Sequence, residues 1–281
     1  MVAPLPSHIV EDAVRRALAE DSTGAGDITS LATIAHDTTA RYELRARKSG
    51  VICGLQPARD AFRQCDPAIK VDAALADGDL VKAGDVVAVI SGLVRPILTA
   101  ERIALNFLGR MSGIATLTAD YVAAIHGTGA VVAHTRKTTP GLRAFEIQAV
   151  RAGGGAAHRY SLSDAVLIKD NHVAAAGGVG EAVKRARAHA GHMTKVATEI
   201  DTLDQLSEAL EARADSILLD NFSLDDLRAA VSHTKGRATL EASGGVTLET
   251  IRAIAKTGVD VISVGALTHS APNFDLGLDA V

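Results

Sequence analysis

Aromatic residues and cysteines are scarce in this chain of 281 residues. Phenylalanine, tyrosine and tryptophan together make up 3% of it, and the formal net charge is -4. A nucleic-acid surface normally carries a broad basic face and stacking aromatic side chains, so the composition argues against that class. The two cysteines, Cys53 and Cys65, cannot build a disulfide framework and lack metal-ligand spacing with neighbouring histidines. We expect both to be ordinary small apolar residues.

Long apolar runs are also missing. No unbroken stretch is long enough for a transmembrane helix. The first residues, MVAPLPSHIVEDAV, lack the basic start and apolar core of a signal peptide. We therefore expect a cytoplasmic protein. With 47% hydrophobic and 22% charged residues, the chain has a globular composition and enough length for one large domain or two ordinary ones.

Positive charge is gathered in residues 134–172, although the whole chain is slightly acidic. The cations lie in three clusters, each after a short apolar run or beside glycines: Arg136-Lys137, His158-Arg159 and Lys169-Asp170. Such a pattern is typical of buried parallel strands whose carboxyl ends hold functional side chains. The clusters suit a small, multiply anionic substrate, because arginine offers a planar fork to carboxylate or phosphate and lysine offers a point charge.

Strand and helix patterns alternate from residue 130 onward, which predicts parallel strands with right-handed crossovers. An open doubly wound sheet would concentrate its site at one switch point, whereas a barrel recruits nearly every strand end. Polar residues follow nearly every strand here, so the sequence predicts a barrel. Strands are expected at 130–135, 165–169, 195–200, 216–220, 238–241 and 260–264. Helices are expected between them at 179–190, 202–213, 223–234 and 247–257. The residues at or just after the strand ends are Arg136, Lys169, Glu199, Asp220, Glu241 and Gly265.

The N-terminal part has a different pattern. Turns at Asp77-Gly78 and at residues 83–85 flank short Val-rich runs and indicate antiparallel hairpins. This piece is similar to swinging-arm carrier domains, but Lys82 lacks the acidic or methionine neighbours that they use, so a structural sheet is favoured. Helices are predicted at 7–20, 57–65 and 98–124, the last with a break near Ser112-Gly113, and strand material at 40–56.

Three motifs, HTRKTTPGLR, AVRAGGGAAHR and LIKDNH, resemble the quinolinate phosphoribosyltransferase family. They occur in the family's order, and similarity at 199, 220, 241–245 and 264–269 extends the resemblance over most of the chain. It implies an α/β fold: an incomplete, seven-stranded α/β barrel catalytic domain at 109–269 beside an N-terminal α+β open-sandwich domain at 1–108. The tail 270–281 is a candidate addition to the N-terminal domain.

The activity implied by the resemblance is the transfer of a phosphoribosyl group from phosphoribosyl pyrophosphate to quinolinate in de novo NAD biosynthesis. The products are nicotinate mononucleotide, CO₂ and pyrophosphate. The implied cofactor is Mg²⁺, with Glu199 and Asp220 as candidate ligands, and the implied assembly is a homodimer. Arg102, otherwise an ordinary solvated helix charge, would then reach the neighbouring subunit's active site. The implied catalytic residues are Lys137, Lys169, Glu199 and Asp220, and the implied substrate-binding residues are these four with Arg102, Thr135, Arg136, His158, Arg159, Ser243, Gly244, Gly245, Val264, Gly265 and Ala266.

Two late segments, EASGGVT at 241–247 and SVGA at 263–266, are similar to the paired barrel loops that bind phosphate through backbone N–H groups. We expect them to hold the 5-phosphate of phosphoribosyl pyrophosphate. Each cluster also has an ordinary interpretation. An Arg-Lys pair is often solvated, a glycine triplet is often a plain loop, and a lone histidine such as His158 is often structural. Glu199 and Asp220 can simply pair with Lys137 or Lys169, and His172 stays ambiguous.

The chain departs from the family pattern at His134, Ile147, Gln148 and Ala197. An aspartate or small residue, a lysine, a tyrosine and a glutamate are commoner at these positions. Three other functions compete: a relative acting on another aromatic carboxylate, a phosphosugar isomerase or lyase, and a non-catalytic binding protein. The HTRKTTPG motif together with the His-Arg pair favours the dicarboxylate substrate.

Overall fold

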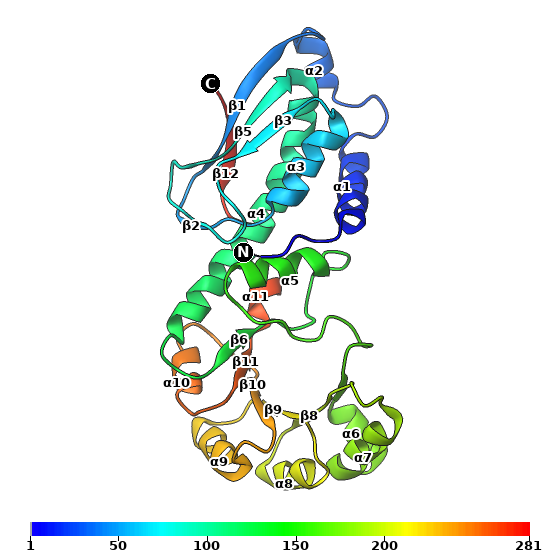
Figure 1. Ribbon diagram of the computed structural model, residues 1–281, viewed down its shortest axis with the longest axis vertical. Helices are drawn as coiled ribbons and strands as arrows, with labels where there is room; N and C mark the ends of the chain where they lie inside the picture. The colour runs from blue at the N-terminus through cyan, green and yellow to red at the C-terminus, as the bar shows by residue number, and fades with distance from the viewer. Residues whose placement is uncertain (1) are drawn as a thin grey trace. The chain divides into compact units, whose positions relative to one another are not determined.

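The computed structural model describes residues 2–281, which divide into two compact units (Figure 1). The N-terminal unit comprises residues 2–119, 139–154 and 270–281, and the C-terminal unit comprises 120–138 and 155–269. Residues 109–119 and 139–154, which the sequence predicts to belong to the catalytic domain, make their contacts within the N-terminal unit. Within the part of the chain described, no helix is long and apolar enough to cross a membrane.

A four-stranded antiparallel sheet forms the centre of the N-terminal unit, in the order β12-β1-β5-β3. The last strand of the chain pairs with the first, so that Leu278 lies opposite Leu44, and Figure 1 shows β12 in red beside β1 in blue. The strands of this unit are β1 (Thr39–Ala46), β2 (Gly50–Val51), β3 (Lys70–Ala73), β4 (Leu80–Val81), β5 (Val86–Leu93) and β12 (Leu276–Ala280). Its helices are α1 (Ser7–Asp21), α2 (Ile28–Thr33), α3 (Leu55–Cys65), α5 (Arg143–Ala152) and most of α4 (Val94–Ala124).

Helix α4 runs unbroken through Ser112 and Gly113, so the predicted break is wrong. The Ser112 hydroxyl accepts the N–H of Cys53 at 2.9 Å and donates to the Cys53 carbonyl at 3.0 Å. A Cβ atom added to Gly113 would lie 2.0 Å from the carbonyl oxygen of Pro272. Both residues therefore serve close packing, which needs small side chains, and neither ends the helix.

Helix α5 was not predicted from the sequence. All its residues from Ala144 to Val150 are buried. A helix that is buried on every side has no polar face, and therefore no 3.6-residue alternation that a sequence pattern could reveal.

The C-terminal unit is built on a six-stranded parallel sheet in the order β6-β11-β10-β9-β8-β7. The six predicted strands are confirmed, and Figure 1 shows α7, α8 and α9 along one side of β8, β9 and β10. The strands are β6 (Val131–Ala133), β7 (Val166–Ile168), β8 (Val196–Ile200), β9 (Ser216–Asp220), β10 (Thr239–Ser243) and β11 (Val261–Ser263). The helices are α6 (Asp170–Ala176), α7 (Val179–His189), α8 (Leu203–Glu211), α9 (Leu224–Thr234), α10 (Ile251–Ala255) and α11 (Ala266–His269).

Candidate active site

A cavity of about 390 Å³ lies at the carboxyl ends of the parallel strands. Lys169 directly follows β7, Asp220 ends β9, and Ser243 ends β10 directly beside Asp220 in the strand register. Because the carboxyl ends of parallel strands meet at one edge of a sheet, short segments far apart in sequence bring their side chains together here. This strand-end cavity is lined by Thr135, Arg136, Lys137, His158, Arg159, Leu167, Lys169, Glu199, Leu218, Asp220, Glu241, Ser243 and Ser263.

Nine residues that the sequence indicated as site residues line this cavity: Thr135, Arg136, Lys137, His158, Arg159, Lys169, Glu199, Asp220 and Ser243. Six others are not in its lining. Gly244 and Gly245 follow Ser243 directly, Val264, Gly265 and Ala266 follow Ser263, and Arg102 belongs to the N-terminal unit.

Four lining residues were not among the predicted catalytic or substrate-binding residues: Leu167, Leu218, Glu241 and Ser263. Glu241 and Ser263 were predicted only as members of the two phosphate-binding segments, and Glu241 also as a strand-end residue. The first three of the four lining residues precede Lys169, Asp220 and Ser243, respectively, by two positions. Side chains two apart on a strand point to the same face. The two-residue period could therefore have added them once the strand-end residues were recognised.

The guanidinium groups of Arg136 and Arg159 are the strongest sign of a ligand. The Nε atoms of both are buried and have no hydrogen-bond partner. Burial, and secondly the nearby charge of Arg136, lower the pKa of Arg159, which nevertheless remains a cation at neutral pH. A buried N–H without a partner is costly, so two of them in one cavity favour an anion that supplies the missing acceptors.

Lys169 and Glu199 form an ion pair within the cavity. This is the pairing that the sequence left open as an ordinary role for Glu199. Asp220 accepts a hydrogen bond from the side-chain amide of Asn221 at 2.8 Å. The backbone N–H of Lys169 donates to His172 Nδ1 at 3.1 Å, so His172 has a capping role at the start of α6.

Lys137 is held by the segment that follows β11. Its carbonyl accepts a 2.7 Å hydrogen bond from the fully buried Thr268 hydroxyl. A Cβ atom on Gly265 would lie 3.2 Å from the Lys137 side-chain Cδ. Gly265 therefore leaves room for the Lys137 side chain, a packing role that the loop motif alone did not reveal.

Gly244 has a similar steric requirement. It has a φ of 96°, and a Cβ atom there would lie 2.2 Å from the side-chain oxygen of Asn221. Any other residue would both strain the backbone and displace Asn221, which in turn donates to Asp220. The glycine of this loop thus supports a carboxylate of the cavity.

The candidate Mg²⁺ ligands are compatible with that ion. Mg²⁺ is commonly bound by one or two carboxylates together with substrate phosphates, and the carboxylates of Glu199 and Asp220 line one cavity. Among residues 2–281 there is no cluster of three or more histidine, cysteine, aspartate or glutamate side chains suited to a metal ion. The two carboxylates are therefore donors of the kind that Mg²⁺ takes.

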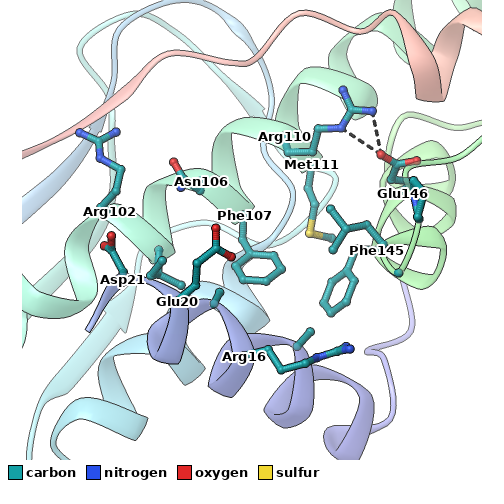
Figure 2. Close-up of a pocket in the computed structure, with 16 residues that line it drawn as sticks. Arg16, Glu20, Asp21, Arg102, Asn106, Phe107, Arg110, Met111, Phe145 and Glu146 are labelled. Atoms are coloured by element: carbon teal, nitrogen blue, oxygen red, sulfur yellow. Dashed lines mark hydrogen bonds and ion pairs between the residues drawn. The ribbon is translucent and has the colours of Figure 1, made fainter. Parts of the chain in front are cut away.

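The N-terminal unit has a cavity of its own, shown in Figure 2. This helix groove, of about 460 Å³, lies among α1, α4 and α5 and the 140–142 loop, and the exposed Arg102 lines it. The rings of Phe107 and Phe145 pack 5.2 Å apart. Figure 2 shows Arg110 joined to Glu146, whose carboxylate also accepts the N–H and hydroxyl of Thr139 at 3.0 and 2.8 Å.

The departures from the family pattern lie in both units. Ile147 and Gln148 are buried in α5, and the Gln148 amide donates to the carbonyl of Ala3 at 3.3 Å. Ala197 lies two residues before Glu199 on β8 and is not part of the cavity lining. His134 is completely buried directly after β6.

Known proteins resemble the whole chain. The family described as quinolinate phosphoribosyl transferase, N-terminal domain, matches residues 27–112, and its C-terminal domain matches residues 114–279. The chain is 43% identical over 287 residues to the nicotinate-nucleotide pyrophosphorylase (carboxylating) of Mycobacterium leprae, covering 99% of this chain and 100% of the relative. It is 41% identical over 259 residues to a probable nicotinate-nucleotide pyrophosphorylase (carboxylating) of Bacillus subtilis, covering 92% and 89%.

A solved structure, that of the nicotinate-nucleotide pyrophosphorylase from Francisella tularensis, superposes with a TM-score of 0.95. Its sequence is 41% identical, and the match covers 99% of this chain and 98% of that one.

Proposed function

Since the chain belongs to the quinolinate phosphoribosyltransferase family and has nicotinate-nucleotide pyrophosphorylase (carboxylating) activity in NAD biosynthesis, we propose that the strand-end cavity is where this reaction occurs. The observation that carries the proposal is the pair of buried, unpartnered Nε groups of Arg136 and Arg159 in one cavity with the carboxylates of Glu199, Asp220 and Glu241.

Quinolinate binds through its two carboxylates. Arg136 and Arg159 each offer a planar fork that matches a carboxylate, and Lys169 and His158 add further positive charge or donors at the same cavity. This clamp directs the pyridine nitrogen toward C1 of the ribose. Holding both reactants in an attack geometry removes much of the entropic barrier to their reaction.

Phosphoribosyl pyrophosphate occupies the rest of the cavity and the adjoining loops. Lys137 and Lys169 neutralise its pyrophosphate. The backbone N–H groups of 243–245 and 264–266 hold its 5-phosphate, consistent with the position of these segments directly after β10 and β11. Glu199 and Asp220 face the ribose and stabilise the positive charge that develops on it, because phosphoribosyl transfer passes through an oxocarbenium-like state.

Glycosyl transfer prepares the decarboxylation. The ring nitrogen forms a bond to C1, and pyrophosphate leaves with the electrons of the C1–O bond. The nitrogen is then cationic. The 2-carboxylate departs as CO₂ and leaves its bonding electrons on the adjacent ring carbon, where the cationic nitrogen stabilises them. A proton from solvent completes nicotinate mononucleotide.

Mg²⁺ is the proposed cofactor, with Glu199 and Asp220 as the residues that would hold it. When bound, it supplies positive charge to the leaving pyrophosphate. Glu199 also pairs with Lys169, so its carboxylate would serve both the lysine and the metal ion.

The proposal also includes a barrel fold for the C-terminal unit and a dimeric assembly for the enzyme. The sheet is one wall of an incomplete seven-stranded barrel, with residues 155–158 as the seventh strand. The support is an isolated parallel bridge between Ala156 and Ala133 of β6. The active enzyme is a cytoplasmic homodimer, in which the exposed Arg102 of one subunit completes the quinolinate clamp of the other.

The deciding experiment is a single-turnover assay with phosphoribosyl pyrophosphate, Mg²⁺ and quinolinate labelled in its 2-carboxylate. We expect labelled CO₂ and nicotinate mononucleotide in equal amounts, and no product from nicotinate. Turnover of nicotinate or another monocarboxylate, without CO₂ from quinolinate, would instead assign the chain to an activity on a different aromatic acid.

A further inference from the structure

His134 lies where a short backbone ladder ends. The N–H of Ala156 donates to the carbonyl of Val132 at 2.7 Å, and Ala133 and Ala156 form a parallel bridge. In a parallel ladder the next donor on this segment, the N–H of His158, would pair with the backbone carbonyl of His134. It donates instead to the side chain of His134, at Nε2, over 3.0 Å.

The imidazole of His134 therefore stands in for a backbone acceptor. Its side chain is completely buried, and its other nitrogen, Nδ1, lies 3.1 Å from the carbonyl of Thr135. Since Nε2 accepts, the ring is neutral and Nδ1 carries the proton toward Thr135. Because the ring replaces the backbone carbonyl as acceptor, the chain at residues 158 and 159 can diverge from β6 while the His158 N–H keeps its hydrogen bond.

The hydrogen bond between His134 and His158 also affects the cavity through the next residue, Arg159. The N–H of Arg159 donates to His158 Nδ1 at 2.8 Å, so two imidazoles accept two consecutive backbone N–H groups. His158 Nε2 is left with its proton, 3.5 Å from the buried Glu241 carboxylate. That distance is longer than an ordinary N–H···O hydrogen bond, and Glu241 Oε1 has no hydrogen-bond partner.

We propose that His134 is a positioning residue for the quinolinate clamp: its Nε2 acceptor fixes where His158 and Arg159 enter the strand-end cavity. His134 is absent from the cavity lining, so it acts through these two residues and does not touch substrate. This inference rests on the proposed function, because it assigns the clamp to quinolinate. It also gives a physical role to a position at which the chain departs from the family pattern.

The test compares His134→Gln with His134→Asn. The amide oxygen of glutamine reaches the position of Nε2 and can accept the His158 N–H. That of asparagine ends near Nδ1 and cannot. A third variant, His134→Phe, keeps the ring shape and removes both nitrogens. The readouts are the KM values for quinolinate and phosphoribosyl pyrophosphate, kcat, and the calorimetric Kd for quinolinate.

Loss of one buried acceptor should raise the quinolinate KM and Kd about 5- to 100-fold in the asparagine and phenylalanine variants, with the phosphoribosyl pyrophosphate KM changed less than about twofold. Glutamine should restore quinolinate binding to within a few-fold of wild type. Equal behaviour of the glutamine and asparagine variants, or equal weakening for both substrates, would overturn the proposal. Wild-type protein that fails to convert quinolinate would overturn the proposed function instead.

Discussion

The two cavities are similar in size and opposite in chemistry. The helix groove measures about 460 Å³ and the strand-end cavity about 390 Å³. In the groove the fully buried Glu146 is satisfied by Arg110 and Thr139. In the strand-end cavity Arg136 and Arg159 keep buried Nε donors without partners. Volume therefore does not distinguish the two cavities, and the proposed active site rests on the unmet hydrogen bonds of the strand-end cavity.

The largest effect is expected on stability, at the groove. Arg110→Met leaves the buried Glu146 carboxylate without its cation, which should lower the free energy of unfolding by about 3–5 kcal/mol. Urea unfolding measures this change in the free energy of unfolding. The double variant Arg110→Met with Glu146→Gln removes the uncompensated charge and should recover part of the loss. A decrease in the free energy of unfolding below about 1 kcal/mol would mean that the Arg110–Glu146 pair contributes little to stability.

The second effect is on catalysis, at the strand-end cavity. Arg159→Ala should lower kcat/KM for quinolinate by about 100- to 1000-fold, since a preorganised donor to the substrate is lost. The free energy of unfolding should fall by only about 0.5–1.5 kcal/mol, because Arg159 Nη1 donates one hydrogen bond, to the carbonyl of Ala165 at 3.0 Å, while its buried Nε has no partner. Steady-state kinetics and urea unfolding of one preparation test both statements.

Arg159→Lys is the matched control for that substitution. It keeps the charge but loses the planar fork, so it should recover only a small part of the activity. Full activity of the lysine variant would show that charge alone matters at this position.

A smaller effect is expected beneath Lys137. Thr268→Val preserves the shape of a buried side chain and removes the hydroxyl that donates to the Lys137 carbonyl. The lost hydrogen bond should cost about 1–3 kcal/mol of stability. Loss of this hydrogen bond should displace the Lys137 backbone, and Lys137 is proposed to neutralise the pyrophosphate. KM for phosphoribosyl pyrophosphate should therefore rise more than KM for quinolinate. Thr268→Ser, which retains the hydroxyl, serves as the control.

The smallest effect is expected at a charge pair away from both cavities. Arg185 and Glu181 form an exposed pair one turn apart on α7. Arg185→Ala should change the free energy of unfolding by no more than about 0.5 kcal/mol and leave kinetics unchanged. A loss as large as that of Arg110→Met would contradict the distinction between buried and solvated charge.

Sequence patterns predicted the parallel strands well because each is a short apolar run followed by polar residues. That rule placed Lys169 and Asp220 at strand ends, as the structure has them. It failed where long-range packing decides. Ser112 and Gly113 indicated a helix break because their partners, Cys53 and Pro272, are distant in sequence.

Two parts of the site were hidden for similar reasons. Glu241 was noted at a strand end, yet it lies within β10 with Ser243 after it, and only the observed strand length makes both face one cavity. The acceptor role of the His134 ring depends on a segment more than twenty residues later, and no local pattern encodes it.

The pairing of β12 with β1 has a consequence for biosynthesis. Leu44 on β1 pairs with Leu278 on β12, which is synthesised more than two hundred residues later. At about 5–20 residues per second, this edge of the first sheet stays unpaired for tens of seconds during translation. An open edge can pair with other nascent chains. The charged side chains of Arg41, Glu43 and Arg45 on β1 discourage such pairing until the final strand emerges and closes the edge.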